Sequence, residues 1–303
     1  MNHPALSAGL LGALVCVLSG CPAPTVAPTD ASTEGSADAV DAGMSLDDAL
    51  TADASADQAE PPVDACDALF GVPNARTGLS AARCQPACGC GASRWTAPTF
   101  DAARLASLRA YRLLDAVSEI TVNPYLSPAR TVPDGAVCAV VVVDRAAHTY
   151  RLQDFASAEL ALAAGAHVTH GGVCGVCSSL EDFAVYAERP DLTEPVRTCG
   201  LRGGGHEGLV TCLRALGFTL PCAQVWAFNT ENTRDVCGEI CIRLLAAPYN
   251  LANGQINACL ACDETRSGEV FKAVAGRTRR NSGTPSAMCR PCSETLRIAH
   301  DYP

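Results

Sequence analysis

The residues AVCAVVVVDRAAHTYRL, numbers 136–152, carry the clearest β-strand signal in this chain of 303 residues. The first half, 136–144, is an almost continuous run of small and β-branched apolar residues, which is typical of a buried strand. The polar turn that follows predicts that 148–152 returns as the second strand of a hairpin. The flanking sequence then decides what packs against this hairpin.

Helical periodicity surrounds the hairpin on both sides. It predicts helices over 101–120, 155–164 and 180–189, a helix that opens from the glycine-rich loop 202–209 and ends at 216, and a last helix over 233–245. The apolar run 222–228 predicts a further strand, and the residues from 250 onwards show only loops and short pieces. No internal repeat is visible, so we expect a single α+β domain over 66–303.

The N-terminus has the pattern of an export signal. Residues 5–18 form an apolar run that is too short to span a membrane as a mature helix, although MNHP before it lacks the usual Lys or Arg. The run ends in LSGC, 18–21, which resembles the lipobox of bacterial lipoproteins. The resemblance implies a signal peptide over 1–20, a lipid on Cys21 and anchoring in the cell envelope, with Pro22 favouring the outer membrane. Cleavage by an ordinary signal peptidase is the alternative.

The segment that follows has the composition of a disordered linker. Residues 22–65 are rich in Ala, Asp, Thr, Ser and Pro, contain no aromatic or basic residue, and hold ten acidic ones. Such a segment buries too little apolar surface to offset the entropy of ordering. Residues 21–65 are therefore predicted to form the lipidated cysteine and an acidic tether that extends itself by charge repulsion.

The net charge of −10 belongs to this tether, because residues 66–303 hold 22 basic and 22 acidic residues. A neutral domain excludes nucleic-acid binding, which calls for a net basic surface. The expected partners are the membrane, through Cys21, and a protein or small molecule of unspecified kind.

Cysteine dominates the composition of the domain, since sixteen of the eighteen cysteines lie in residues 66–303. An even number in an exported domain predicts a disulfide framework of up to eight bridges, and spacing alone does not give their connectivity. Cys237 and Cys241 are four residues apart on a predicted helix and share one face. We expect them to bond to other segments, as in a stapled helical hairpin.

The stretch HVTHGGVCGVCSSLEDFAVY, 167–186, is the candidate reactive site. We expect Cys174 and Cys177 in the first turn of the helix that Leu180 packs down, where unpaired N–H groups and the helix dipole lower the pKa of a thiol. CGVC resembles the CxxC motif of thioredoxin-like oxidoreductases. That resemblance implies that Cys174 attacks, that Cys177 resolves the mixed disulfide, and that Pro221 is the family's proline before a strand.

The same residues also resemble the CGxC pattern of papain-like cysteine hydrolases. This second resemblance implies Cys177 as nucleophile and Cys174 as a structural disulfide partner, although the family's oxyanion glutamine and following aromatic residue are missing. The base would be His206 or His300, and Asn229 would orient it. A free Cys177 leaves an odd number of cysteines to pair. Structural bridges to distant cysteines are the remaining alternative.

Metal binding is a further hypothesis for the same stretch. Two imidazoles and two thiolates, from His167, His170, Cys174 and Cys177, would suit tetrahedral zinc. A second zinc pattern is the pair of CxxC motifs formed by Cys259, Cys262, Cys289 and Cys292, for which an oxidising compartment favours disulfides. No cofactor other than zinc is expected.

A group of basic residues lies between these two CxxC motifs. Its members, Lys272, Arg277, Arg279 and Arg280, would suit an anion-binding loop, and a solvated loop is the favoured alternative. The function that these observations favour is a lipid-anchored, disulfide-stabilised, extracytoplasmic binding or interaction module. A thiol–disulfide oxidoreductase, a papain-like hydrolase and a metal-binding protein remain as alternatives.

Overall fold

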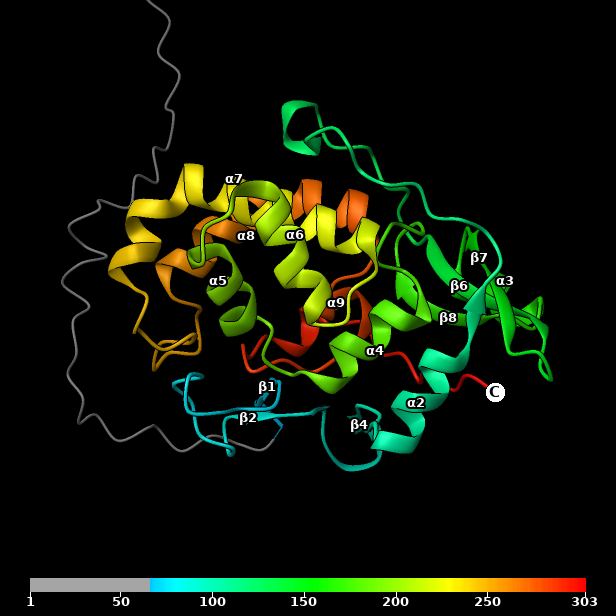
Figure 1. Cartoon of the computed structure of the whole chain (residues 1–303). Coiled ribbons are helices and arrows are strands. Elements are labelled where there is room, and N and C mark those ends of the chain that lie inside the picture. Colours follow the sequence, from blue (N-terminus) through cyan, green and yellow to red (C-terminus); the bar gives the residue numbers. More distant parts are fainter. Residues whose placement is uncertain (1–65) are drawn as a thin grey trace, which may run out of the picture. The chain divides into compact units, whose positions relative to one another are not determined.

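The predicted hairpin forms the middle of a four-stranded sheet in the computed structural model, which describes residues 66–303 (Figure 1). The strands are β5 (Arg112–Leu113), β6 (Val137–Asp144), β7 (Thr149–Phe155) and β8 (His167–Gly171), in the spatial order β5-β7-β6-β8. β6 pairs antiparallel with both β7 and β8, and β5 pairs parallel with β7. β6 is therefore a central strand, as its apolar run predicts.

Alternate residues of β6 enter two different cores. Val137 and Ala139 pack with Ala161 of one covering helix, whereas Val140 packs with Tyr150 and the helices of the opposite face. The covering helices are α2 (Ala102–Ala110), α3 (Ala158–Ala163) and α4 (Leu180–Glu188), of which α2 and α4 share the second face. The first half of β6 is thus buried on both faces, in agreement with its valine-rich sequence.

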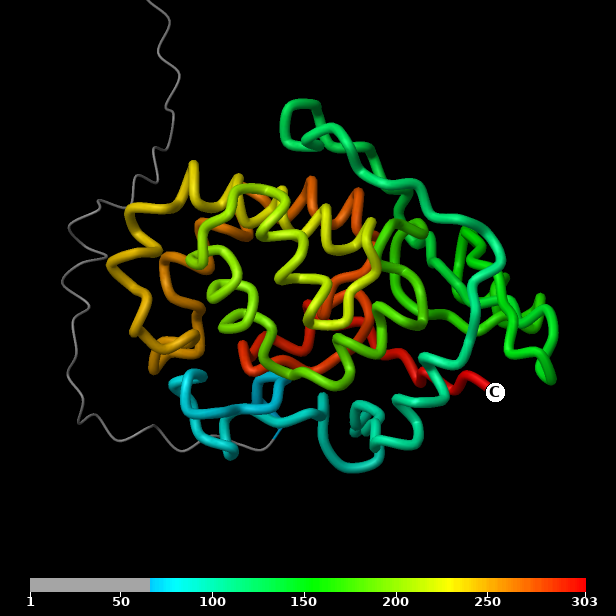
Figure 2. The backbone as a smooth tube through the Cα atoms, in the orientation of Figure 1, coloured from blue at the N-terminus to red at the C-terminus, as the bar shows by residue number. Residues whose placement is uncertain are grey.

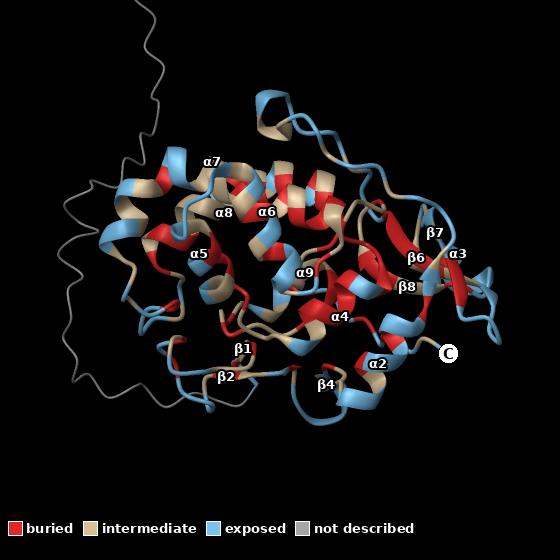
Figure 3. Ribbon diagram, viewed as in Figure 1, coloured by how far each residue is buried: buried red, intermediate tan, exposed pale blue. Residues whose placement is uncertain are grey.

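A second, helical layer continues from α4. Its members are α5 (Thr193–Leu201), α6 (Gly205–Ala215), α7 (Leu220–Arg243), α8 (Ala258–Ala275) and α9 (Arg279–Ser282). Leu213, Val225 and Phe271 meet in its core, and Figure 3 shows the buried inner faces of these helices against exposed outer faces. Within residues 66–303 no helix is both long and apolar enough to cross a membrane. The predicted α+β class is confirmed.

The strand predicted over 222–228 is wrong, because these residues belong to α7. Thr219 is the N-cap in extended conformation, and Pro221 occupies the first turn, where its missing N–H leaves no bond unmade. α7 is buried along this part, so several sides of the helix are apolar. A short continuous apolar run does not by itself distinguish a buried helix from a strand.

The prediction of loops from 250 onwards is also wrong, because α8 fills much of this region. Asn257 caps it with its side chain on the N–H of Leu260, and Gly276 ends it with a positive φ of 75°. The helix predicted over 101–120 ends at Ala110, because Tyr111 is extended and leads into β5.

Eight disulfides join all sixteen cysteines of the domain, which confirms the predicted framework. The bridges are Cys66–Cys90, Cys84–Cys289, Cys88–Cys292, Cys138–Cys174, Cys177–Cys222, Cys199–Cys212, Cys237–Cys262 and Cys241–Cys259. Two of them tie α7 to α8, so the predicted stapled helical hairpin is confirmed. Two others tie the first described residues to the last ones.

The N-terminal part of the domain has little regular structure. Its short elements are β1 (Leu69–Phe70), β2 (Cys84–Gln85), β3 (Ala87–Cys88), η1 (Gly91–Ser93) and β4 (Trp95–Thr96). β1 pairs with β2 and β3 with β4, in two-residue ladders. Such ladders are too short to be stable alone, so the bridges to the region of η3 (Cys292–Glu294) hold this part in place.

Residues 114–136, which we call the strap, leave the sheet and pass over the helices (Figure 2). The strap contains one short helix, η2 (Pro124–Leu126), which contacts α7 and α8. The Tyr125 hydroxyl donates to Asn229 Oδ1 at 2.6 Å, and the N–H of Ile120 donates to Gln224 Oε1 at 2.8 Å. The predictions for 1–65 lie outside the described residues.

Candidate functional site

Cys174 and Cys177 are not bonded to each other. Cys174 is bridged to Cys138 of β6, and Cys177 to Cys222 of α7. Neither lies in the first turn of a helix, because α4 begins at Leu180 and the N–H of Cys177 donates to Ala275 O at 2.9 Å. A disulfide sulfur is not a thiolate, so the redox and nucleophilic roles stay predictions that require a reduced protein.

The two candidate histidine bases have other partners. His206 Nδ1 lies 3.1 Å from Glu231 Oε2, at the N-terminal end of α6. His300 is buried, with Nε2 2.6 Å from Ser282 O. Among residues 66–303, no hydrogen bond joins either histidine to Cys177. The predicted nucleophile of a hydrolase, Cys177, is therefore in a disulfide bond, and neither candidate histidine is hydrogen-bonded to it.

The four proposed zinc ligands of 167–177 do not converge. Both ring nitrogens of His170 are engaged, Nε2 with Ser178 Oγ at 2.6 Å and Nδ1 with Gly171 O at 3.0 Å. His167 Nδ1 lies 3.6 Å from a carboxylate oxygen of Asp301. The cysteines of both zinc patterns are disulfide-bonded, so their donor sets do not fit zinc in this oxidised form.

One cluster of metal-ligand type remains within the described residues. Ligand atoms of Cys138, Asp154 and Cys174 lie within 4.8 Å of one another. The two sulfurs are bonded to each other, and Asp154 accepts the N–H of Cys174 at 2.6 Å. The carboxylate therefore fixes the backbone beside a bridge, and the cluster does not fit a metal ion.

The state of the cysteines has a direct test. We expect no cysteine of residues 66–303 to react with iodoacetamide when protein made in an oxidising compartment is denatured without reductant. Intact mass and peptide mapping would give the number and position of the labels. Alkylated Cys177, or a bridge from Cys174 to Cys177, would contradict this structure and restore the catalytic hypotheses.

Arg277, which belongs to the predicted basic loop, is instead fully buried. Its Nε donates to Cys177 O at 3.1 Å, and its Nη atoms donate to Thr169 O at 3.0 Å and Ser178 O at 3.0 Å. The guanidinium also lies over the Phe183 ring, 4.7 Å from its centre. Arg277 thereby joins β8 and the segment before α4 to the end of α8, so this residue is structural.

Two buried histidines flank this guanidinium and give stability a pH dependence. Burial, reinforced by the charge of Arg277, lowers the pKa of His170 to about 3 and that of His300 to about 3. The unfolded chain takes up protons below a pKa of about 6.5, whereas the folded chain does not. Each histidine therefore destabilises the fold as pH falls from 6.5 towards 3. Burial raises the pKa of Asp182 to about 6, which acts in the opposite direction.

A comparison with the variant His170→Gln isolates one histidine, because Asp182 contributes equally to both proteins. We expect the difference in unfolding free energy between wild type and variant to shrink by about 3 kcal/mol from pH 7 to pH 4. Urea denaturation at each pH measures it. A difference that does not change with pH would show that the folded protein protonates His170 as readily as the unfolded chain does.

A cavity of about 1020 Å³ lies between α5, α7, α8 and the segment 278–296, and the end of the strap adds to its wall. Its long walls come from single faces of two helices that run antiparallel. The lining residues of α7 include Trp226, Thr230 and Arg234, and those of α8 include Leu260, Glu264, Gly268 and Lys272, at the four-residue spacing that one face of a helix requires.

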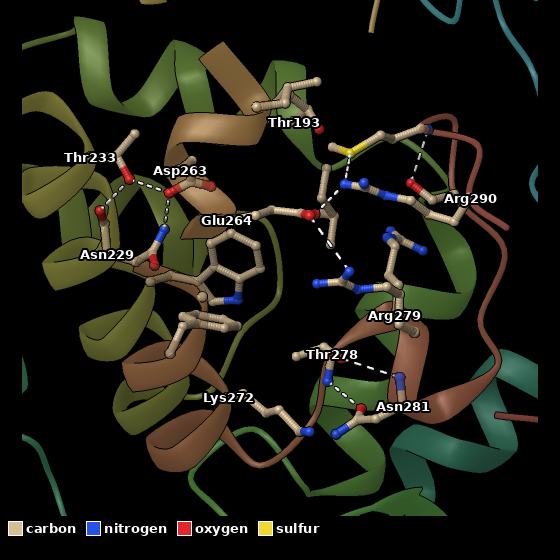
Figure 4. A pocket seen from close by; sticks show the side chains of 18 of the residues that line it. Thr193, Asn229, Thr233, Asp263, Glu264, Lys272, Thr278, Arg279, Asn281 and Arg290 are labelled. Carbon is tan, nitrogen blue, oxygen red and sulfur yellow. Dashed lines mark hydrogen bonds and ion pairs between the residues drawn. The ribbon is translucent and has the colours of Figure 1, made fainter. Parts of the chain in front are cut away.

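Aromatic and aliphatic side chains form much of this cavity (Figure 4). Trp226 and Phe271 meet edge to face with ring centres 4.7 Å apart. The indole N–H of Trp226 donates to the Tyr186 hydroxyl at 3.2 Å, so its polar atom is satisfied. Val196 is buried in the same cluster, and Leu260 is buried further along α8. Such a surface takes up an apolar group without leaving a polar atom unpaired.

Glu264 is held between two arginines inside the cavity. It pairs with Arg290 and lies 3.5 Å from Arg280, which also pairs with Glu294 at 3.1 Å. Figure 4 shows Glu264 reaching from α8 towards Arg290 of the C-terminal segment. Burial raises the pKa of the Glu264 carboxyl despite the two neighbouring arginines. The cluster closes the cavity on this side.

Asp263, the neighbour of Glu264, faces α7 instead. It accepts from the Thr233 hydroxyl and from Asn229 Nδ2, the latter at 3.5 Å, and both partners also line the cavity. Burial raises the pKa of Asp263 above its ordinary value. Because the strap hydroxyl of Tyr125 donates to Asn229, this network connects the strap to the cavity wall.

The basic loop is only partly solvated, so the favoured sequence prediction of a solvated loop is wrong for Arg277 and Arg279. Arg279 donates to Tyr186 O at 3.1 Å, to Pro285 O at 2.9 Å and to Arg189 O, and burial lowers its pKa to about 10. Lys272 is exposed at the cavity edge. The loop turns inward because three backbone carbonyls replace water around the guanidinium.

Trp226, Asp263 and Glu264 were missed as functional residues because α7 was interpreted as a strand in one part and α8 as loops. The signal that identifies α8 is the side chain of Asn257 as an N-cap, followed by lining residues at every fourth position. The sequence did identify Lys272 and Arg280, which do line the cavity.

Residues 206–298 match a family of unknown function (DUF8771). The match begins in α6 and includes α7 and α8, so it covers the two long walls of the cavity and excludes Cys174 and Cys177. No curated protein and no solved structure matches the chain.

Proposed function

We propose that this chain is a lipid-anchored, extracytoplasmic binding module whose ligand occupies the cavity between α7 and α8. The observation that carries the proposal is the cavity itself, whose volume of about 1020 Å³ is at the upper end of the range for small-molecule sites. Apolar side chains such as Trp226 and Phe271 form part of its wall, and polar and charged groups lie beside them, a combination that binds and orients small molecules.

The compartment is supported by the eight bridges and by the N-terminal sequence. Eight disulfides in one domain are stable in an oxidising compartment and rare in a reducing one. The LSGC sequence at 18–21 adds a lipid on Cys21 by resemblance to bacterial lipoproteins. Pro22 favours the outer membrane by the same resemblance.

Gly268 permits a test in which blocking the cavity does not unfold the protein. It lies in α8 on the cavity face, and a Cβ placed there meets no atom within 4 Å. Gly268→Leu should stabilise the helix by about 1 kcal/mol, because glycine is a poor helix former. The same leucine should weaken binding of the neutral dye Nile red about tenfold or more, because it occupies ligand volume.

Gly268→Ala is the matched control, with the same gain in helix propensity and little added volume. Nile red fluorescence measures binding, and thermal unfolding measures stability. We expect the alanine variant to bind as wild type does. Equal binding by the leucine variant, or no binding by wild type, would refute the proposed site.

The anchor requires a separate test, because binding and anchoring involve different parts of the chain. We expect Cys21→Ala to move the protein from the membrane fraction to the soluble fraction of its host and to abolish labelling by a fatty-acid analogue. Nile red binding should remain. An unchanged distribution and labelling would contradict lipidation at Cys21.

A further inference from the structure

The charges of the cavity do not balance. On one side, Glu264 and Glu294 are paired with Arg280 and Arg290, two carboxylates with two guanidiniums. The charges within this cluster cancel, so the cluster adds no net charge to the cavity that a ligand would meet. The remaining charged groups of the cavity therefore decide which ligand charge is favoured.

Of the remaining basic groups, Arg197 lies 3.5 Å from Glu194, and the other three lack carboxylate partners. Within residues 66–303, the side chains of Lys272 and Arg234 form no hydrogen bond or ion pair. Arg279 is hydrogen-bonded to three carbonyl oxygens. Asp191 interacts with it electrostatically but lies beyond ion-pair distance. Carbonyls satisfy its N–H groups but leave its positive charge uncompensated.

The opposing acidic groups are fewer. Asp134 lies exposed at the end of the strap. Asp263 is already bonded to Thr233 and Asn229, and burial disfavours its charged form. A further guanidinium, that of Arg277, lies behind the wall and is bonded to carbonyls as well. The surplus is therefore positive, and a positive surplus favours a ligand with negative charge.

The position of Lys272 places part of this surplus beside the aromatic residues. Lys272 follows Phe271, which contacts Trp226 across the helix pair. Figure 4 shows Lys272 extending from α8 on the side where Thr278 and Asn281 also line the cavity. At the opposite end of the pair, Ile242 is a largely exposed apolar residue of the wall. A positive group next to an apolar channel matches a ligand with an acidic head and an apolar body.

We infer that the cavity takes an anionic amphiphile, whose acidic head group lies towards Lys272 and Arg279 and whose apolar body lies along α7 and α8. This inference rests on the proposed function, because it specifies the ligand of the same cavity. A carboxylate or a phosphate head would supply the same negative charge and hydrogen-bond acceptors.

Three ten-carbon probes below their micellar concentrations separate charge from apolarity: decanoate, decyl phosphate and decyltrimethylammonium, with decyl glucoside as the neutral reference. Trp226 reports binding in the variant Trp95→Phe, which removes the other tryptophan. We expect each anion to bind about tenfold more tightly than the cation, with the glucoside between them. The tighter anion identifies the head group.

Variants on one helix then locate the head group. Lys272→Gln should weaken decanoate about three- to fivefold and leave the glucoside unchanged, because it removes one partly solvated charge. Glu264→Gln should strengthen decanoate, because it leaves Arg280 and Arg290 with surplus charge. Arg266→Gln, an exposed position of α8 outside the cavity, is the control for net charge and should have no effect.

The outcomes distinguish this inference from the proposed function. Cation or glucoside binding as tight as that of the anions would overturn the inference and leave the binding site in place. An equal loss in Arg266→Gln and Lys272→Gln would also overturn it, since only overall charge would matter. Failure of all probes, together with failure of Nile red, would overturn both.

Discussion

Removing Cys84–Cys289 and Cys88–Cys292 together should destabilise the domain by about 7 kcal/mol, whereas removing either bridge alone should cost about 2.5 kcal/mol. Both bridges join the same two segments, near the first and last described residues. While one remains, the other closes only a small additional ring. When both are lost, a loop opens that the other bridges shorten to about 100 residues, and the unfolded chain gains its entropy.

Guanidinium denaturation of the Cys→Ala variants, with the remaining bridges intact, measures this difference. The control is Cys199–Cys212, which closes a short loop with no parallel bridge and should cost about 3 kcal/mol. The double removal should exceed the sum of the single ones. Simple additivity would mean that the two bridges constrain different parts of the unfolded chain.

Arg277→Met should destabilise the domain by about 3 to 5 kcal/mol, the second largest effect we expect. The methionine retains much of the side-chain volume over Phe183 but leaves the carbonyls of Thr169, Cys177 and Ser178 without their buried donors. These carbonyls lie about 100 residues before Arg277 in the sequence. The loss should therefore separate the sheet from the helical layer.

Arg277→Lys and Arg266→Met make this result specific. The lysine retains the charge but reaches fewer carbonyls. Its loss of unfolding free energy should therefore be smaller than that of the methionine variant and larger than that of a surface substitution, which lies within about 0.5 kcal/mol. Arg266→Met is such a surface change on the same helix. Urea denaturation, with near-ultraviolet circular dichroism as probe, compares the three. Equal stability of Arg277→Met and Arg266→Met would show that the hydrogen bonds of Arg277 do not stabilise the fold.

Much of the sheet and of the covalent framework could be predicted from local sequence. β6 and β7 follow from the valine-rich run 136–144 and the turn after it, because a central strand is apolar on both faces. The pairing of Cys237 and Cys241 with another helix follows from their spacing on one helical face. These features depend on residues close in sequence, which is why the pattern is sufficient.

The candidate site could not be predicted in this way. CGVC has the spacing of a reactive pair, but its cysteines bond to β6 and α7, and only the tertiary arrangement selects these partners. The cavity depends on α7 and α8. The apolar run in the first part of α7 is too short to distinguish a helix from a strand, and the apolar residues of α8 show too weak a helical period to predict a helix there.

The sequence by itself determined that residues 66–303 form an α+β domain whose cysteines pair, because composition and local periodicity set secondary structure and redox state. Only the tertiary structure decided that Arg277 is buried and Arg279 half-buried while Lys272 remains exposed, although all belong to one basic stretch. The physical reason is that an arginine is buried where carbonyls from distant segments meet its N–H groups, and those carbonyls are brought together only by the fold.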